Sequence, residues 1–293
     1  MHKAGFVNIV GNPNVGKSTL MNALLGERIS IATFKAQTTR HRIMGIYNTE
    51  EMQIVFSDTP GVLKPATKLQ QSMLEFSESA LEDADVLLYV TDVVEKTDKH
   101  EDFVAKAAAL KVPVLVLINK IDLTDQKKLE ELVEKWMALF PHAEIIPISA
   151  SNKFNTEYVL KRVKALLPDS PPYFDKDQWT DRPARFFVSE IIREKILLYY
   201  DKEIPYSVEV AVEQFKEYEN RISINAVIYV ERESQRGIII GKNGRALKRV
   251  ATEARLSLEK FFSKKIFLEV FVNVDKDWRS SDKELKNFGY LQK

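Results

Sequence analysis

The sequence of 293 residues contains no cysteine, which excludes a disulfide framework and any metal site built from thiolates. No apolar run approaches the roughly 20 residues that a membrane-spanning helix needs, and the longest runs, such as Val112–Ile118, have the length of strands. The chain enters an apolar segment already at Phe6, which leaves no room for a secretory signal peptide. We therefore expect a cytoplasmic protein that is at most bound to a membrane surface.

The formal net charge is only +1, but the charge is distributed unevenly along the chain. Residues 231–265 contain ten lysines and arginines and four glutamates, which gives this segment a net charge of +6. Residues 266–293 are neutral overall, so the chain before residue 231 carries a net charge of −5. This pattern predicts either an acidic body with a basic binding region or a basic face that contacts only solvent, and charge alone leaves both open.

The first half of the sequence alternates short apolar runs with amphipathic stretches. The runs, rich in β-branched residues, have the length of strands, and the stretches between them have helical periodicity. The expected strands are 6–10, 44–47, 52–57, 86–91, 114–119 and 144–149, and the expected helices are 17–25, 69–82, 98–110, 127–139 and 155–167. This alternation predicts an α/β domain over residues 1–168, with a mostly parallel sheet and helices on both of its faces.

A proline-rich break separates this domain from a second region with a different pattern. Pro168, Pro171 and Pro172, with the polar residues that follow them, predict a linker over 169–182. Beyond it we expect a small α+β domain over 183–275. Its expected elements are helix 183–199, strands 208–212 and 222–230, helices 235–240 and 244–262, and strand 266–272. The tail 276–293 has mixed charge, and no role is assigned to it.

A phosphate-binding motif connects the first expected strand to the first expected helix. Residues 11–18 (Gly-Asn-Pro-Asn-Val-Gly-Lys-Ser) match the pattern G-x-x-x-x-G-K-[ST] in the context that this pattern requires. In such a loop backbone N–H groups surround the phosphates, Lys17 contacts the β- and γ-phosphates, and Ser18 supplies a hydroxyl to Mg²⁺. The predicted nucleotide-binding residues here are Gly11, Asn12, Pro13, Asn14, Val15, Gly16, Lys17, Ser18 and Thr19.

A second motif, residues 58–61 (Asp-Thr-Pro-Gly), follows another expected strand. Asp58 at the end of this strand is predicted to hold Mg²⁺, and the N–H of Gly61 to contact the γ-phosphate. Between the two motifs lie Thr38 and Thr39, one of which should complete the Mg²⁺ shell when a nucleoside triphosphate is bound and release it after hydrolysis. The predicted nucleotide contacts of the second motif are Asp58, Thr59, Pro60 and Gly61.

A third motif, residues 119–122 (Asn-Lys-Ile-Asp), determines the base. The carboxylate of Asp122 accepts hydrogen bonds only, which suits the adjacent N1–H and amine of guanine, whereas adenine would leave it unpaired. Asn119 is predicted to brace the loop, and the stem of Lys120 to cover the ring of the base. After the next strand a backbone N–H of the segment Ser149, Ala150 and Ser151 is predicted to contact guanine O6. The sequence therefore predicts GTP as the nucleotide.

A Gly-x-x-Gly turn lies within the basic segment, between two expected helices. Such a turn allows a nucleic-acid backbone to approach closely, and Ile238, Ile239 and Ile240 before it are expected to line a groove for unstacked bases. A simple helix–turn–helix would show the same four residues, but the order of elements and the positive charge favour RNA binding. The predicted RNA-binding residues are Arg236, Gly241, Lys242, Asn243, Gly244, Arg245, Lys248 and Arg249.

The motifs of the first domain resemble those of the translation-factor-related TrmE/Era-like GTPases. The resemblance includes residues 37–40 (Gln-Thr-Thr-Arg), in which the threonine before the arginine is the usual magnesium ligand of the family, so it favours Thr39. Members of this family lack the glutamine that positions water in Ras-like proteins, and here Val62 follows Gly61. Members with an asparagine matching Asn14 use it to hold K⁺ against the phosphates. The resemblance thus implies slow hydrolysis accelerated by K⁺, with Lys17, Asn14, Thr39 and Gly61 as the catalytic residues.

The second domain resembles a type II KH domain, with residues 237–250 carrying the likeness. A GTPase of this family joined to such a KH domain implies a protein that binds near the 3′ end of small-subunit ribosomal RNA, acts on the assembling small subunit and associates peripherally with the inner membrane. We expect it to be a monomer. Two other hypotheses are an RNA-binding protein that senses GTP with negligible turnover, which Val62 keeps open, and a P-loop ATPase or small-molecule kinase, which Asp122 argues against.

Overall fold

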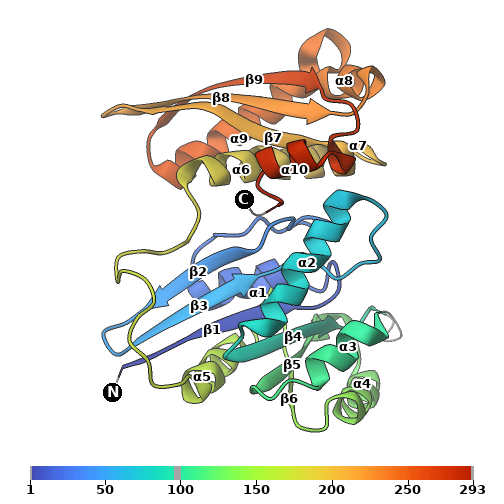
Figure 1. The fold of residues 1–293 in the computed structure, drawn as a ribbon, viewed down its shortest axis with the longest axis vertical. Coiled ribbons are helices and arrows are strands. Elements are labelled where there is room, and N and C mark those ends of the chain that lie inside the picture. Colours follow the sequence, from blue (N-terminus) through green and yellow to red (C-terminus); the bar gives the residue numbers. More distant parts are fainter. Residues whose placement is uncertain (1, 96–99, 292–293) are drawn as a thin grey trace. The chain divides into compact units, whose positions relative to one another are not determined.

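The computed structural model describes residues 2–95 and 100–291, which fall into two compact units (Figure 1). Unit 1 comprises Met1–Ala66 and Gln70–Asp181, and unit 2 comprises Thr67–Leu69 and Arg182–Lys293. Among the described residues, no helix combines the length and the apolar character needed to cross a membrane.

Unit 1 is built on a six-stranded sheet with the strand order β2-β3-β1-β4-β5-β6. Its strands are β1 Lys3–Val10, β2 Ile43–Asn48, β3 Met52–Asp58, β4 Val86–Asp92, β5 Val114–Asn119 and β6 Glu144–Pro147. The β2–β3 pair is antiparallel, as expected for a hairpin, and all other neighbours are parallel. Because the parallel strands end at the same edge of the sheet, the loops that carry the three nucleotide motifs are brought together there.

The helices of unit 1 cover the sheet, and every residue of β4 is buried although its side chains alternate between the two faces. The helices are α1 Lys17–Leu25, α2 Lys68–Glu82, α3 Glu101–Ala108, α4 Gln126–Leu139 and α5 Thr156–Leu166. On one face Tyr89 of β4 packs against Trp136 and Phe140 from the region of α4, with ring centroids 5.4 and 5.0 Å away. Residues 98 and 99, which the sequence assigns to the third helix, lie outside the described residues.

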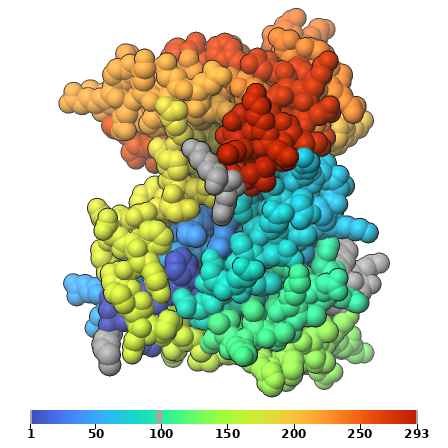
Figure 2. Space-filling model, viewed as in Figure 1, coloured from blue at the N-terminus to red at the C-terminus, as the bar shows by residue number. Residues whose placement is uncertain are grey.

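The segment that the sequence predicts as a linker is hydrogen-bonded along the β2–β3 hairpin of unit 1. The backbone N–H groups of Tyr173 and Phe174 donate to the side-chain oxygen of Gln53, at 2.7 and 2.9 Å. Further along, the backbone N–H of Ile46 donates to the carbonyl of Trp179 at 3.0 Å. In Figure 2 this yellow segment lies on the surface of unit 1. Its contacts extend to Asp181, after which the chain enters unit 2.

Unit 2 consists of a three-stranded sheet, order β7-β8-β9, with helices packed on one of its faces (Figure 1). Its elements are α6 Ala184–Tyr199, α7 Ile204–Ser207, β7 Glu209–Glu217, β8 Arg221–Val230, α8 Glu233–Ile240, α9 Arg245–Phe262 and β9 Lys265–Val274. The β7–β8 pair is antiparallel and the β8–β9 pair is parallel. Alternate residues of β8 from Ile222 to Val230 are buried beneath α6 and α9, as the period of two in the sequence predicts.

The tail after β9 folds back onto unit 2. It forms a short 3₁₀ turn, η3 Trp278–Ser280, and the helix α10 Asp282–Asn287. The indole N–H of Trp278 donates to the carbonyl of Ser207 at 3.1 Å, and the hydroxyl of Tyr290 donates to the carboxylate of Glu209 at 2.7 Å. Both aromatic side chains are buried. The tail is therefore a packed part of this unit, a role that its mixed charge did not reveal.

Candidate functional site

The phosphate loop is held close to the strands behind it. Gly11 has a φ of +143°, and a Cβ at this position would lie 2.0 Å from the carbonyl oxygen of Val90 in β4. The loop therefore requires glycine there, both for its backbone conformation and for space. Helix α1 begins directly after Gly16, and no side chain caps its first N–H groups. A helix N-terminus without a side-chain cap, at the end of a parallel strand, suits an anionic group.

Lys17 lies buried under the loop. Its ammonium donates to the carbonyl oxygens of Gly11 and Asn12 at 3.0 and 2.8 Å. Burial lowers the pKa of Lys17 to about 8, although the charges of Asp58 and Glu95 act in the opposite direction. Phosphate oxygens beside this lysine would stabilise the ammonium form that burial disfavours, so the site suits an anionic ligand.

Three oxygen-bearing side chains from separate segments converge beside α1. The hydroxyl of Ser18 donates to the carboxylate of Asp58 at 2.7 Å, and that of Thr39 donates to the same oxygen at 3.2 Å. The hydroxyls of Ser18 and Thr39 lie 2.9 Å apart. Thr38 lies elsewhere, because its hydroxyl donates to the carbonyl of Lys35 at 2.6 Å. Of the two candidate threonines, the structure brings Thr39 to this cluster.

This cluster fits a magnesium ion. Asp58 is fully buried, its Oδ1 has no hydrogen-bond partner, and burial raises its pKa. A buried, partly unpaired carboxylate is unfavourable unless a cation neutralises it. No group of three His, Cys, Asp or Glu side chains suited to a metal occurs in residues 2–95 and 100–291. One carboxylate with two hydroxyls is instead the kind of set that holds Mg²⁺ together with substrate phosphates.

The second motif approaches the phosphate loop so closely that it needs a glycine. A Cβ on Gly61 would lie 2.5 Å from Cα of Pro13. The following residue, Val62, is buried in the hydrophobic core, and its N–H donates to the carbonyl of Gly11 at 3.2 Å. The side chain of Val62 therefore lies in the core, away from the phosphate site. Thr59, also buried, donates its hydroxyl to the carbonyl of Ile9 at 2.8 Å.

The third motif connects the base-binding loops to the phosphate loop. The amide of Asn119 donates to the carbonyl of Val15 at 2.7 Å, and its oxygen accepts from the N–H of Ala150 at 3.0 Å. Asn119 thus braces the loops, as its predicted role requires. It also engages the N–H of Ala150, one of the three residues among which the sequence predicts the donor to guanine O6. Asp122, in the 3₁₀ turn η1 Ile121–Leu123, is exposed and accepts from the hydroxyl of Ser149 at 2.6 Å.

Two acidic residues at the end of β4 belong to this site, although the sequence motifs did not identify them. Asp92 accepts from the ammonium of Lys120 at 2.5 Å, and that ammonium also donates to the carbonyl of Asn14 at 2.6 Å. Glu95 accepts from the amide of Asn12 at 2.9 Å and from the hydroxyl of Thr91. The signal that could have revealed them is their position, with Asp92 as the last residue of a buried parallel strand and Glu95 just after it.

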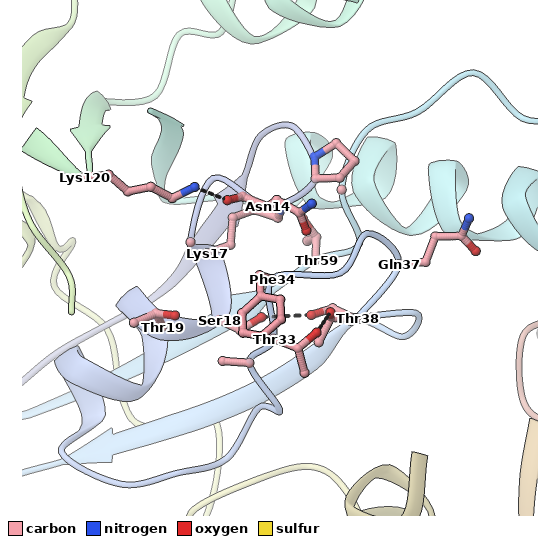
Figure 3. Close-up of a pocket in the computed structure, with 15 residues that line it drawn as sticks. Asn14, Lys17, Ser18, Thr19, Thr33, Phe34, Gln37, Thr38, Thr59 and Lys120 are labelled. Carbon is pink, nitrogen blue, oxygen red and sulfur yellow. Dashed lines mark hydrogen bonds between the residues drawn. The ribbon is translucent and has the colours of Figure 1, made fainter. Parts of the chain in front are cut away.

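These elements surround a cavity of about 390 Å³ at the end of the sheet (Figure 3). Its lining residues are Pro13, Asn14, Gly16, Lys17, Ser18, Thr19, Ala32, Thr33, Phe34, Gln37, Thr38, Thr39, Thr59, Gly61 and Lys120. Most of the predicted phosphate and magnesium residues are among them. The predicted nucleotide residues that are not among the lining residues are Gly11, Asn12, Val15, Asp58, Pro60, Asn119, Asp122 and Ser149–Ser151. The aromatic ring of Phe34 is a lining group that the motifs did not predict.

The second predicted site lies between α8 and α9 of unit 2. The turn η2 Lys242–Gly244 follows Gly241, and both Asn243 and Gly244 have a positive φ, of 54° and 74°. The predicted basic residues around it, Arg236, Lys242, Arg245, Lys248 and Arg249, are all exposed. Exposed cations beside the N-terminus of α9 are available to a phosphate backbone.

The prediction that Ile238, Ile239 and Ile240 line one groove is wrong for Ile239. Ile239 is fully buried in the core of unit 2, and its carbonyl accepts from the hydroxyl of Tyr200 at 2.7 Å. Ile238 remains half exposed and Ile240 is partly buried against the core. The helical period turns Ile239 inward, so three successive side chains cannot line one surface. Arg249 stacks on the ring of Tyr199, with its guanidinium carbon 4.0 Å from the ring centroid.

Comparisons with known proteins find one family match in unit 1 and another in unit 2. Residues 6–120 match the family described as 50S ribosome-binding GTPase, and residues 203–279 match the KH domain. The chain is 45% identical to the GTPase Era of Geotalea uraniireducens over 98% of both chains. It is 46% identical to that of Syntrophus aciditrophicus, over 99% of this chain and 96% of the other.

Solved structures give the same result. A crystal structure of Era with MgGDPNP and nucleotides 1506–1542 of 16S ribosomal RNA matches all of this chain, with a TM-score of 0.94 and 38% identity over the whole of both chains. A single-residue variant of Aquifex aeolicus Era, bound to GDP·AlF4⁻, matches with a TM-score of 0.94 and 39% identity, covering 99% of this chain and 100% of the other. A phosphate loop, a guanine-type third motif and a KH domain in one chain, together with full-length similarity, show that this protein belongs to the Era family of GTPases.

Proposed function

We propose that this GTPase is a switch that binds small-subunit ribosomal RNA near its 3′ end and acts in the assembly of the small ribosomal subunit. The observation that carries the proposal is that one chain joins a complete set of GTPase motifs to an exposed, basic Gly241–Gly244 turn. The relative whose structure contains MgGDPNP and 16S ribosomal RNA supports both parts of the proposal.

The RNA part is tested by the affinity of the full chain for an RNA matching nucleotides 1506–1542, the segment in that relative's structure. Binding is measured by fluorescence anisotropy with the GTP analogue GDPNP and with GDP. We expect the GDPNP form to bind this RNA at least about tenfold more tightly than an unrelated RNA of equal length, since specific binding exceeds the electrostatic background. Equal affinity for both RNAs would contradict the proposal.

In hydrolysis the residues of the chain position and neutralise the phosphates. Lys17 places its charge at the phosphate loop, and the uncapped N–H groups at the start of α1 would surround the β-phosphate. Ser18, Thr39 and Asp58 would hold Mg²⁺, which neutralises charge on the phosphate oxygens when it is bound. Because Val62 is buried in the core, no side chain at that position orients water, and we propose a slow intrinsic rate.

We propose that Asn14 compensates for the missing water-orienting side chain by holding a potassium ion. Asn14 lies exposed on the phosphate loop with a φ of 67°, lines the cavity, and its carbonyl is fixed by Lys120. An asparagine can adopt this φ simply as a turn former, so the side chain and the conformation have to be separated. Asn14→Gly separates them, because glycine keeps the positive φ without the amide.

We expect turnover at least about tenfold faster in potassium than in sodium at equal ionic strength, since charge neutralisation dominates this chemistry. We expect Asn14→Gly to lose this difference while its GDP affinity stays within about twofold, because the backbone of the loop is retained. Phosphate release measured in both salts checks the prediction. Equal turnover of the unsubstituted protein in the two salts would reject the potassium proposal.

The alternative, an RNA-binding protein that senses GTP with negligible turnover, draws on the same buried Val62. Single-turnover phosphate release with and without the RNA separates the two. Release that is accelerated by RNA supports a switch driven by hydrolysis, whereas bound GTP that remains intact in both conditions favours the alternative.

We further propose that the protein is a cytoplasmic monomer that associates peripherally with the cytoplasmic face of the inner membrane. The exposed basic residues around the Gly241–Gly244 turn support an affinity for anionic surfaces. Light scattering tests the oligomeric state. Co-sedimentation with vesicles of anionic and of neutral lipid tests the membrane association, which neutral vesicles should not support.

A further inference from the structure

The most exposed of the large hydrophobic side chains in the described residues is Phe34, at 82%. Single exposed apolar residues are common on protein surfaces and need no function. Phe34 differs because it lines the nucleotide cavity and is the only aromatic residue among its fifteen lining residues. The other lining side chains are polar or small, so this ring is the one large apolar surface that a ligand would meet there.

The turn that carries Phe34 is held by its neighbours rather than by the ring. The hydroxyls of Thr33 and Thr38 lie 2.7 Å apart, and the backbone N–H of Lys35 donates to the hydroxyl of Thr33 at 3.1 Å. The hydroxyl of Thr38 donates back to the carbonyl of Lys35 at 2.6 Å. These hydrogen bonds close the turn on either side of Phe34 and leave its ring exposed toward the cavity. A substitution of the ring therefore leaves the bonds of the turn in place.

Phe34 lines the same cavity as Lys17 and Ser18 of the phosphate loop and Lys120 of the third motif. In the view of Figure 3 Lys17, Thr19 and Lys120 are drawn on one side of Phe34, and Thr59 and Gln37 on the other. Phosphates bind at Lys17 and Ser18, and the base binds toward Lys120 and Asp122. Asp122 and Ser149–Ser151, predicted to contact the base, are not among the lining residues, so the cavity that Phe34 lines takes the phosphates and the ribose that joins them to the base. Of these two parts only the ribose has an apolar C–H face.

We infer that Phe34 covers the ribose of the bound guanine nucleotide, packing its ring on the C–H face of the sugar and slowing release of the nucleotide. This inference rests on the proposed function, since it requires a guanine nucleotide in the cavity. The contact is apolar and makes no use of the phosphates. It therefore distinguishes a nucleoside diphosphate from inorganic pyrophosphate, which carries the same charges without a sugar.

The test measures release of radiolabelled GDP from the full chain by filter binding after a chase with unlabelled GDP. We expect Phe34→Ala to release GDP about tenfold faster and Phe34→Trp to restore the rate to within about twofold, because covering a ring of this size changes mainly the off-rate. Met137→Ala on α4, which removes another exposed apolar side chain of unit 1 outside the cavity, should release GDP at the unsubstituted rate.

Two further measurements locate the effect at the sugar. Pyrophosphate should bind with equal affinity to the unsubstituted protein and to Phe34→Ala. The fluorescence of Phe34→Trp, after subtraction of the unsubstituted protein, should shift to the blue and lose acrylamide quenching with GDP but not with pyrophosphate. Met137→Trp should show neither change.

Unchanged GDP release from Phe34→Ala would overturn the inference, as would equal losses of GDP and pyrophosphate affinity, which would mean that the loop itself had changed. Either result leaves the proposed function standing, because the unsubstituted protein still binds GDP. If the unsubstituted protein binds no GDP at all, the proposed function fails, and this inference fails with it.

Discussion

Two glycine-bearing turns in this molecule precede helices and are predicted to meet phosphates, but they are built differently. In the phosphate loop a Cβ on Gly11 would lie 2.0 Å from a backbone oxygen of β4, and Lys17 is buried. In the Gly241–Gly244 turn a Cβ on Gly244 would meet nothing within 4 Å, and Lys242 is exposed. The first turn is enclosed by distant parts of its domain, whereas the second is open at Gly244. A Cβ on Gly241 would meet only a near neighbour in sequence, with Cβ of Ala246 at 2.6 Å.

This difference indicates how each turn obtains its shape. The phosphate loop is fixed by groups distant in sequence, such as Asn119, which donates to Val15, and Glu95, which accepts from Asn12. The turn of unit 2 is closed by local backbone bonds, with Gly241 donating to Gly237 and Gly244 to Gly241. We expect a site held by distant contacts to lose its shape when one of these contacts is removed. A turn closed by local bonds should keep its shape after a substitution, so that its binding depends mainly on its charge.

The largest effect is expected for Gly11→Ala. Its methyl group would overlap the carbonyl of Val90, so the loop or β4 has to move. We expect a loss of about 3 kcal/mol or more of the free energy of unfolding of unit 1, and GDP binding weakened more than about 100-fold. Calorimetry with and without GDP measures both quantities. Stability and affinity equal to those of the unsubstituted protein would show that the loop is not enclosed as described.

A charge placed in the open turn should have the next largest effect, and on RNA alone. Gly244 has a φ of 74° and open space around it, a conformation that both aspartate and asparagine tolerate. We expect Gly244→Asp to weaken RNA binding about tenfold, since it sets an anion against the phosphate backbone. Gly244→Asn, which has the same shape without the charge, should retain most of the affinity. Similar losses in both variants would indicate a steric cause instead.

The regular elements around the phosphate loop could be predicted from the sequence. Helix α1 begins and ends at the predicted residues 17 and 25, and β5 spans the predicted 114–119, because apolar periodicity and a glycine stop are local signals. The sequence placed the motifs of unit 1 at the ends of parallel strands for the same reason. The structure brings Ser18 and Asp58 together at that edge of the sheet.

What the sequence did not reveal depends on contacts between distant segments. The residues alone do not distinguish two adjacent threonines, although the family resemblance favoured Thr39. The path of the loop turns Thr39 toward Asp58 and Thr38 toward Lys35. The tail looked featureless because the partners of Trp278 and Tyr290 lie 71 and 81 residues earlier in the chain. Local pattern carries no information on such pairs. The wrong surface for Ile239 has another cause, because the helical period by itself separates three successive side chains.

A smaller effect is expected when the same methyl group is added to the open turn. Gly244→Ala leaves the space unobstructed, so its main cost is the positive φ, about 1 kcal/mol for a residue other than glycine. Calorimetry of Gly244→Ala beside Gly11→Ala compares one chemical change in the two environments. A loss as large as that in Gly11→Ala would remove the distinction between an enclosed turn and an open one.

The smallest effect concerns the buried lysine of the enclosed loop. Burial lowers the pKa of Lys17 to about 8, so the ammonium that meets the phosphates is lost as the pH rises through that value. Bound phosphates favour the charged form, and GDP binding above this pH therefore takes up a proton. From pH 7.0 to 8.5 the fraction of free protein in which Lys17 is charged falls about fourfold, and without magnesium the GDP affinity should fall by the same factor.

Titration calorimetry in buffers of different ionisation enthalpy measures the affinity and the proton uptake together. Lys17→Arg is the matched control, since a guanidinium does not deprotonate in this range. An affinity that stays constant or rises over this interval would show that Lys17 is already neutral, or that its burial does not govern phosphate binding.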